Sequence, residues 1–167
     1  MRILGIDPGY AIVGFGVLDY DNVRFKTLKY GAITTSPDDR FDLRLKEIYE
    51  DMNVLIDKFR PDCMSIEKLY FNTNITTGID VAEARGVITL AAAMKNIPIF
   101  EYTPLQIKVA VTGYGRAEKR QMQEMTKNIL HLGEIPKPDD AADALAIAIC
   151  HGHTGGSRLS EIARENS

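Results

Sequence analysis

The stretch "RILGIDPGYAIVGFGVLD", residues 2–19, consists of two apolar runs joined by a tight link. Residues 2–6 have the pattern of a short buried strand, and residues 11–19 resume that pattern after the link "DPGY". A turn signal, "DN", then precedes residues 23–33, in which apolar and polar residues roughly alternate. We therefore expect three consecutive antiparallel strands at the start of the chain.

Helical and strand patterns alternate in the rest of the chain. We predict helices over about 37–60, 80–95, 104–111, 117–132 and 139–151, with strands over 62–67 and 97–103 between them. Ser36 is the expected N-cap of the first of these helices, with Pro37 as its first helical residue. The two later strands each follow a helix, so we expect them to join the sheet of the three antiparallel strands as parallel strands. The expected fold class is therefore α/β, with a five-stranded mixed sheet flanked by helices.

The division of the chain into domains follows from its length and its last residues. A chain of 167 residues is the usual size of one domain, and we expect that domain to span residues 1–151. From residue 152 onward the sequence is glycine-rich and polar, so we expect residues 152–167 to form a flexible tail. His151 and His153 have no Cys or further His nearby, which favours the fraying end of the last helix over a zinc site.

The composition is that of an ordinary globular protein, with 45% hydrophobic and 26% charged residues. No apolar run reaches the 18 or so residues that a membrane span needs. The first residues have neither a secretory nor a transit pattern, so we expect a cytoplasmic protein without a membrane partner. Cys63 and Cys150 lie in apolar stretches of the sequence, which indicates reduced thiols in the core and not a disulfide. With a net charge of −3, the protein as a whole does not attract nucleic acid, so any such binding would depend on a local cluster of basic residues.

Four carboxylates stand where the surrounding pattern is apolar. Asp7 ends the first strand and Glu67 ends the fourth. Asp140 and Asp143 occupy the first turn of the last helix, and residues three apart share a helix face. Asp139 lies about 100° round the helix, where it is better placed as the N-cap. If the first and fourth strands are neighbours and the last helix packs against them, the four carboxylates converge.

Converging carboxylates predict a particular chemistry. They would repel one another and raise one another's pKa unless a cation neutralised them. Oxygen ligands without Cys or His favour Mg²⁺ or Mn²⁺ over zinc. Two such ions about 4 Å apart can promote in-line attack on a phosphodiester, one by activating water and the other by stabilising the leaving oxygen. Taken singly, each acid can equally be a turn residue, a surface acid or a helix N-terminal acid favoured by the macrodipole, but the combination favours a metal site.

Five motifs in order resemble those of the RuvC-type Holliday junction resolvases. They are "ILGIDPGYAIVGFGVL", "SIEKLYF", "AEARGV", "TPLQIKVAVTGYGRAEK" and "DDAADALAIAI", and together they cover about residues 2–150. The resemblance implies a ribonuclease H-like fold and a homodimeric, Mg²⁺-dependent endodeoxyribonuclease. Such an enzyme cuts four-way DNA junctions in two strands of like polarity, in DNA recombination and repair.

The resemblance also assigns residues to the active site. The family's acidic tetrad falls on Asp7, Glu67, Asp140 and Asp143, which would bind two Mg²⁺ ions, for which Mn²⁺ can substitute. This assignment agrees with the helix-face argument. The family's two active-site basic residues fall on Lys108 and Lys119, of which we favour Lys119 as the group that stabilises developing negative charge.

Candidate DNA-binding residues come from the same motifs. The aromatic residue that contacts bases in the family falls on Tyr70, with Phe71 beside it, and exposed aromatic rings can stack on unpaired bases. One stretch is locally basic in an acidic protein and suits phosphate contact; its cations are Lys108, Arg116, Lys119, Arg120 and Lys127. The plain alternative for that stretch is a solvated helix face.

The expected partners follow from the substrate. A four-way junction has near two-fold symmetry, so an isologous dimer would present two sites to opposed strands. The helix of small residues from Ala82 to Ala93 can form the dimer contact, or it can be a buried central helix of the monomer. The resemblance also suggests that a branch-migration complex of the RuvA and RuvB type delivers the junction.

Other functions remain open at this point. Another ribonuclease H-like nuclease, for example one that cuts RNA in hybrid duplexes, would use the same carboxylates. An actin-like or sugar-kinase-like ATPase also begins with a strand-turn-strand phosphate loop similar to "GIDPGYAIVGFGV". Such ATPases need a second domain and a second glycine-rich loop, which this sequence lacks. The complete tetrad argues against a junction-binding module without activity.

Overall fold

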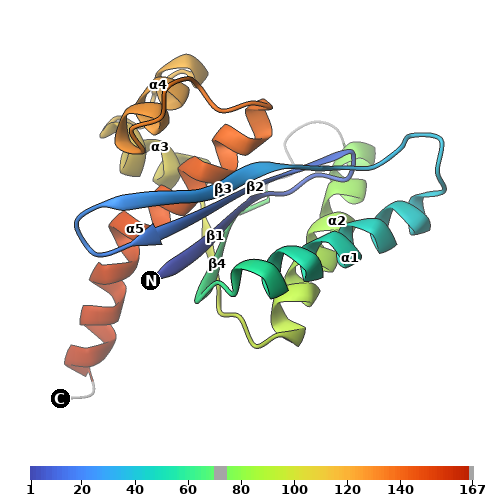
Figure 1. The fold of residues 1–167 in the computed structure, drawn as a ribbon, viewed down its shortest axis with the longest axis horizontal. Helices are drawn as coiled ribbons and strands as arrows, with labels where there is room; N and C mark the ends of the chain where they lie inside the picture. Colours follow the sequence, from blue (N-terminus) through green and yellow to red (C-terminus); the bar gives the residue numbers. More distant parts are fainter. Residues whose placement is uncertain (70–74, 166–167) are drawn as a thin grey trace.

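The structure, a computed structural model, describes residues 1–69 and 75–165 of the chain. Among these residues the strands are β1 (Arg2–Asp7), β2 (Ile12–Tyr20), β3 (Phe25–Thr34), β4 (Cys63–Glu67) and β5 (Ile99–Tyr102). The helices, drawn in Figure 1, are α1 (Phe41–Phe59), α2 (Ile75–Met94), α3 (Pro104–Thr112), α4 (Lys119–Ile129) and α5 (Asp139–Glu165). Within this described part of the chain, no helix combines the length and the apolar character that a membrane crossing needs.

All five strands belong to one sheet in the order β3-β2-β1-β4-β5. β2 pairs antiparallel with both β1 and β3, whereas β4 runs parallel to β1 and β5 runs parallel to β4. This arrangement confirms the predicted mixed sheet, in which two parallel strands reach the sheet through helices. It also makes the first and fourth strands neighbours, so their carboxyl ends meet at one edge of the sheet.

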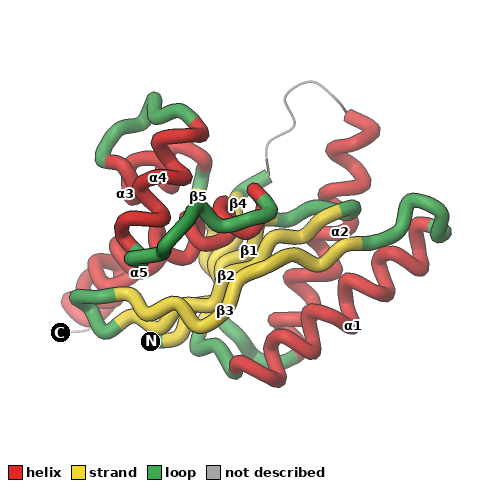
Figure 2. Tube along the Cα trace, turned by 45° about the horizontal axis from the view of Figure 1, so that its top comes forward, coloured by secondary structure: helices red, strands yellow, loops and turns green. Residues whose placement is uncertain are grey.

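Helices cover both faces of the sheet. Figure 2 shows the strands between the pair α1 and α2 on one side and the group α3, α4 and α5 on the other. Alternate residues of a strand point to opposite faces, so Leu4 packs with Ile48 of α1 and Ile88 of α2. Ile3, its neighbour in the chain, packs on the other face with Leu145 of α5. Burial of these apolar side chains fixes the helices against the sheet.

Two glycines bring α5 unusually close to the sheet. A Cβ atom at Gly5 of β1 would overlap the backbone oxygen of Ala144, and one at Gly14 of β2 would overlap the backbone oxygen of Asp140. Because neither residue has a side chain, the backbone of α5 lies directly on β1 and β2. These contacts set the depth at which the acidic first turn of α5 lies.

Helix α1 begins later than the sequence predicts. It starts at Phe41, with Arg40 in the N-cap position. The Ser36 hydroxyl accepts a hydrogen bond from the backbone N–H of Asp38 at 3.2 Å, which closes a local turn instead of capping a helix. The prediction of Ser36 as the N-cap is therefore wrong.

Helix α5 continues past residue 151, where we expected regular structure to end, as far as Glu165. Figure 1 shows its last turns projecting beyond the sheet. His151 is buried, and its Nδ1 forms a hydrogen bond of 2.7 Å with the Tyr102 hydroxyl. The His153 ring packs against Phe25, with 5.3 Å between ring centroids. The predicted helix end at these histidines is wrong because their contacts with β5 and with the β2–β3 hairpin stabilise further helical turns.

Candidate active site

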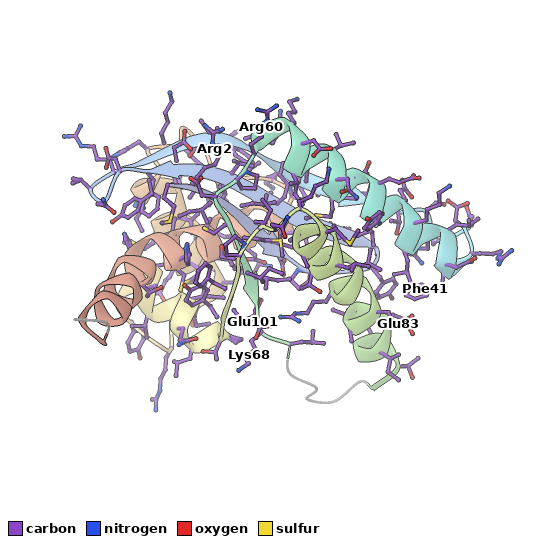
Figure 3. All side chains as sticks on the ribbon, turned by 90° about the horizontal axis from the view of Figure 1, so that it is seen from below. Arg2, Phe41, Arg60, Lys68, Glu83 and Glu101 are labelled. Carbon is purple, nitrogen blue, oxygen red and sulfur yellow. The ribbon has the colours of Figure 1, made fainter. Side chains whose placement is uncertain are left out.

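The carboxyl ends of β1 and β4 bring Asp7 and Glu67 together. The parallel ladder pairs Ile6 with Ile66. The next residues, Asp7 and Glu67, therefore lie at the same level of adjacent strands and point to the same face. That face is the one that α5 covers, because Gly5, two residues before Asp7, contacts this helix. Lys68, which directly follows Glu67, is labelled in Figure 3 near this edge of the sheet.

Helix α5 adds the other two carboxylates. Asp7 pairs across the antiparallel ladder with Gly14, and the backbone of Asp140 lies directly against Gly14. Asp143 is three residues further on and shares a helix face with Asp140. The structure thus brings into electrostatic contact the four acids that the sequence singles out, from the ends of two strands and the first two turns of one helix.

Two lysines stand beside these acids. Lys108 lies on α3, and Lys119 is the first residue of α4. The Lys119 Nζ lies 3.6 Å from Asp143 Oδ2. Both lysines line a cleft of about 250 Å³ with Glu67 and Asp143. The cleft residues are Glu67, Pro104, Ile107, Lys108, Lys119, Met122, Asp143, Ala146 and Ile147. Apolar walls around charged groups lower the local dielectric constant and strengthen their interactions.

Burial and mutual repulsion raise the pKa of three of the carboxyl groups. The pKa of Asp7 is raised to about 8, by burial first and then by the three neighbouring carboxylates. Burial and the charge of Asp143 also raise the pKa of Glu67. For Asp143 itself, burial raises the pKa and outweighs the lowering effect of Lys119. Full ionisation of these acids would therefore bring together more negative charge than the neighbouring lysines neutralise.

The donor set fits a hard divalent cation. Its charged donors are carboxylate oxygens, the ligands that Mg²⁺ and Mn²⁺ prefer. Across residues 1–69 and 75–165, no three His, Cys, Asp or Glu side chains lie close enough as they stand to hold one ion. The carboxylates of Asp7, Glu67 and Asp143 interact at Coulombic range instead, so binding of a cation requires their side chains to turn toward one another. Relief of their repulsion favours that movement.

The raised pKa of Asp7 predicts that the metal-free protein loses stability as the pH rises. Below about pH 4 the carboxyl is protonated in both the folded and the unfolded states. Between about pH 4 and its folded pKa of about 8, the unfolded state releases this proton while the folded state retains it, so the free energy of unfolding falls. We expect Asp7→Asn to stabilise the protein by about 1–3 kcal/mol at pH 8 in EDTA and to have little effect at pH 4.

Urea unfolding of the wild type and Asp7→Asn at both pH values measures this difference. An equal effect of the substitution at pH 4 and pH 8 would show that the Asp7 carboxyl ionises normally in the fold.

Asp139 plays a different role from the expected one. Helix α5 begins at Asp139 itself, so this residue is the first helical residue and not the N-cap. Its Oδ2 lies 3.3 Å from Lys119 Nζ, and its Oδ1 accepts a hydrogen bond of 3.2 Å from Gln123 Nε2. The prediction of Asp139 as a cap is therefore wrong. The signal that sequence reasoning missed is the spacing of four between Asp139 and Asp143, which also places two residues on one helix face.

The other predicted DNA-binding residues lie near Lys119 in the chain. Arg116 is in the loop between α3 and α4, and Arg120 is the second residue of α4; both are exposed. Tyr70 and Phe71, the predicted stacking residues, lie outside the described residues. The basic stretch thus reaches from the cleft, through Lys119, to an exposed loop and helix.

The sequence matches known proteins over nearly its whole length. Residues 3–151 match the family described as crossover junction endodeoxyribonuclease RuvC. A protein of that name from Brevibacillus brevis is 59% identical over 151 residues, which cover 90% of this chain and 91% of the relative.

The fold matches solved structures as well. The structure of Thermus thermophilus RuvC superposes with a TM-score of 0.87 at 31% sequence identity and covers 94% of this chain and 96% of that chain. A structure of T. thermophilus RuvC in complex with a Holliday junction substrate has the same TM-score and coverage at 29% identity.

Proposed function

The chain belongs to the RuvC family of crossover junction endodeoxyribonucleases, and from that premise we propose that it resolves four-way DNA junctions by hydrolysing one phosphodiester in each of two strands. The observation that carries this proposal is the electrostatic interaction of Asp7 with three further carboxylates from β4 and α5, beside a cleft that two lysines line. The ribonuclease H-like fold, shared with a relative that was solved on a Holliday junction, supports the choice of substrate.

In this proposal the carboxylates of Asp7, Glu67, Asp140 and Asp143 hold two Mg²⁺ ions, for which Mn²⁺ can substitute. Bound ions of this kind activate the attacking water and stabilise the leaving oxygen. The two strands and α5 fix the backbone positions of the four residues, so only their side chains need to turn when the ions bind. The Lys119 ammonium group lies 3.6 Å from Asp143 Oδ2 and stabilises the negative charge that develops on the phosphate, and Lys108 lines the same cleft.

Contacts with the rest of the DNA follow the basic stretch. Arg116 and Arg120 bind phosphates next to the cleft, which supplies the local attraction that a net charge of −3 does not. Tyr70 or Phe71 stacks on bases near the crossover. Family membership also supports delivery of the junction by a branch-migration complex of the RuvA and RuvB type.

A homodimer supplies the second active site that paired incisions need. One face of α2 is buried in the monomer through Ala84, Ile88, Ala91 and Ala92. The opposite face is exposed and carries Ile79, Glu83, Gly86, Leu90 and Met94, of which Glu83 is labelled in Figure 3. A Cβ atom at Gly86 would meet nothing within 4 Å. This row recurs every three or four residues, as a helix seam does, and its small centre would let a second α2 approach closely.

Leu90→Glu is expected to convert the dimer into a monomer. Leu90 is 53% exposed in the single chain, so the substitution leaves the monomer's core intact while placing a charge in the proposed interface. Light scattering coupled to size exclusion measures the mass directly. Val23→Glu, at a residue 80% exposed in the turn between β2 and β3, is the matched control and is expected to stay dimeric. An unchanged mass for Leu90→Glu would exclude α2 as the dimer contact.

Cleavage of an immobile four-way junction tests the proposed function. With Mg²⁺ we expect paired nicks in two strands of like polarity, with ends that DNA ligase can seal, and no cleavage in EDTA. Linear duplex and RNA–DNA hybrid of the same sequences serve as competitors. Equal cleavage of the duplex would overturn junction selectivity, and preference for the hybrid would point to a ribonuclease H-like activity on RNA instead.

A further inference from the structure

Lys119 is held between two carboxylates of α5. Its Nζ lies 3.3 Å from Asp139 Oδ2 and 3.6 Å from Asp143 Oδ2. Because Asp139 and Asp143 are four residues apart on one helix, they present adjacent carboxylates to the same ammonium group. One of these two acids belongs to the proposed metal site and the other does not. The Lys119 ammonium group is therefore shared between Asp143, which is proposed to bind metal, and Asp139, which is not.

Asp139 also makes a second contact with α4. Gln123, one helical turn after Lys119, donates its Nε2–H to Asp139 Oδ1 at 3.2 Å. The two oxygens of one carboxylate thus contact two successive turns of α4, and together they link the start of α4 to the start of α5. The Asp139 and Lys119 side chains remain 58% and 57% exposed, so their ion pair contributes at most about 1 kcal/mol to stability. Its larger effect is on where the ammonium group lies.

We propose that Asp139 is a positioning residue that keeps Lys119 at the rim of the active site and so leaves Asp143 available to a divalent cation. This inference rests on the proposed function of the tetrad. Without the Asp139 carboxylate, the nearest acid to the Lys119 ammonium is Asp143, and the ammonium then competes with the cation for that group. With Asp139 present, Lys119 retains a partner when Asp143 turns to the cation, and its charge stays next to the reacting phosphate.

The proposal has a thermodynamic test that requires no DNA. Mn²⁺ binding to the metal-free protein is measured by the electron paramagnetic resonance signal of free Mn²⁺, for the wild type, Asp139→Asn, Lys119→Met and the double variant. We expect Asp139→Asn to weaken Mn²⁺ binding about three- to fivefold, the scale of a half-exposed ion pair. In the Lys119→Met background, the same Asp139→Asn change is expected to have no effect, since no competing ammonium remains.

Two results of this cycle would overturn the proposal. In the first, the Asp139→Asn variant binds Mn²⁺ as tightly as the wild type. In the second, the substitution weakens Mn²⁺ binding equally with and without Lys119, which would mean that the Asp139 charge acts on the cation directly from a distance. Glu134→Gln removes the same charge from the exposed segment just before α5 and is the matched control. If the wild type binds Mn²⁺ with the expected cycle yet cuts no junction, the proposed function fails while the role of Asp139 stands.

Steady-state cleavage gives the second readout. We expect Asp139→Asn to lower kcat about fivefold with KM for the junction unchanged, because every cation of the basic stretch is retained and only the placement of the Lys119 ammonium group beside the reacting phosphate is lost. Asp139→Glu, which keeps the charge, is expected to restore at least half of the lost rate. A rise in KM with unchanged kcat, or no recovery in Asp139→Glu, would contradict a positioning role.

Discussion

Asp7→Asn is expected to lower kcat for junction cleavage by at least about a thousandfold, equivalent to about 4 kcal/mol of transition-state stabilisation. Burial and the three neighbouring carboxylates raise the pKa of Asp7 to about 8. An amide of the same shape keeps the fold but removes the charge that a divalent cation needs. Single-turnover cleavage with saturating Mg²⁺ measures the loss.

Junction binding by Asp7→Asn separates catalysis from recognition. We expect the Kd for the junction at pH 7 in EDTA to stay within about threefold of the wild type, because the metal-free Asp7 carboxyl, with a pKa of about 8, is largely neutral there and the amide changes the charge little. Asp38→Asn, at an exposed residue in the turn before α1, removes the same charge elsewhere and is expected to cleave normally. Retention of more than a tenth of the wild-type rate by Asp7→Asn would remove Asp7 from the catalytic centre.

Gly14→Ala is expected to lower both stability and activity through the backbone. The added methyl group would overlap the backbone oxygen of Asp140, so the first turn of α5 must move away from β2. Overpacking of this kind costs about 1–3 kcal/mol of folding free energy. A displacement of about 1 Å at a catalytic group lowers the rate by about a hundredfold. Urea unfolding and single-turnover cleavage measure the two effects on one preparation.

Substitution of two other glycines separates the effect on the active site from the general loss of stability. Gly5→Ala would press on the backbone of Ala144, one turn further along α5, and is expected to destabilise the protein to a similar extent with a smaller loss of activity. Gly133, in the segment between α4 and α5, is exposed, and a Cβ atom there would meet nothing within 4 Å; Gly133→Ala is therefore expected to leave both unchanged. Equal losses of activity for Gly14→Ala and Gly5→Ala would mean that the position of Asp140 has no special importance.

Much of the fold could be predicted because the hydrophobic patterns of the sequence agree with the strands and helices of the structure. The apolar runs before Asp7 and before Glu67 are strands, and each run ends at its acid. The spacing of Asp140 and Asp143 is a property of any helix, so their shared face follows from sequence alone. The strand order of the structure, with β1 beside β4, meets the condition under which the four acids come to one edge.

The errors arose where contacts between distant residues decide the local structure. Helix α5 passes residue 151 because His151 meets Tyr102 and His153 meets Phe25, from segments about 50 and 130 residues earlier. Glycine-rich composition after that point predicted an end of the helix near residue 151, since propensity takes no account of such packing. The same limit explains Asp139, whose partners Lys119 and Gln123 lie on another helix. Gly14 could have been recognised, because a glycine in the interior of a strand often marks a close approach of another backbone.

A crystal of the protein soaked in Mn²⁺ and measured at the manganese absorption edge tests most directly whether the four carboxylates form one metal centre. We expect anomalous density between Asp7, Glu67, Asp140 and Asp143, at about 2.0–2.3 Å from their carboxylate oxygens, and its loss in Asp7→Asn crystals. Anomalous density only at other sites, or density at the tetrad that persists in Asp7→Asn with the same occupancy, would contradict a catalytic metal centre built from these four residues.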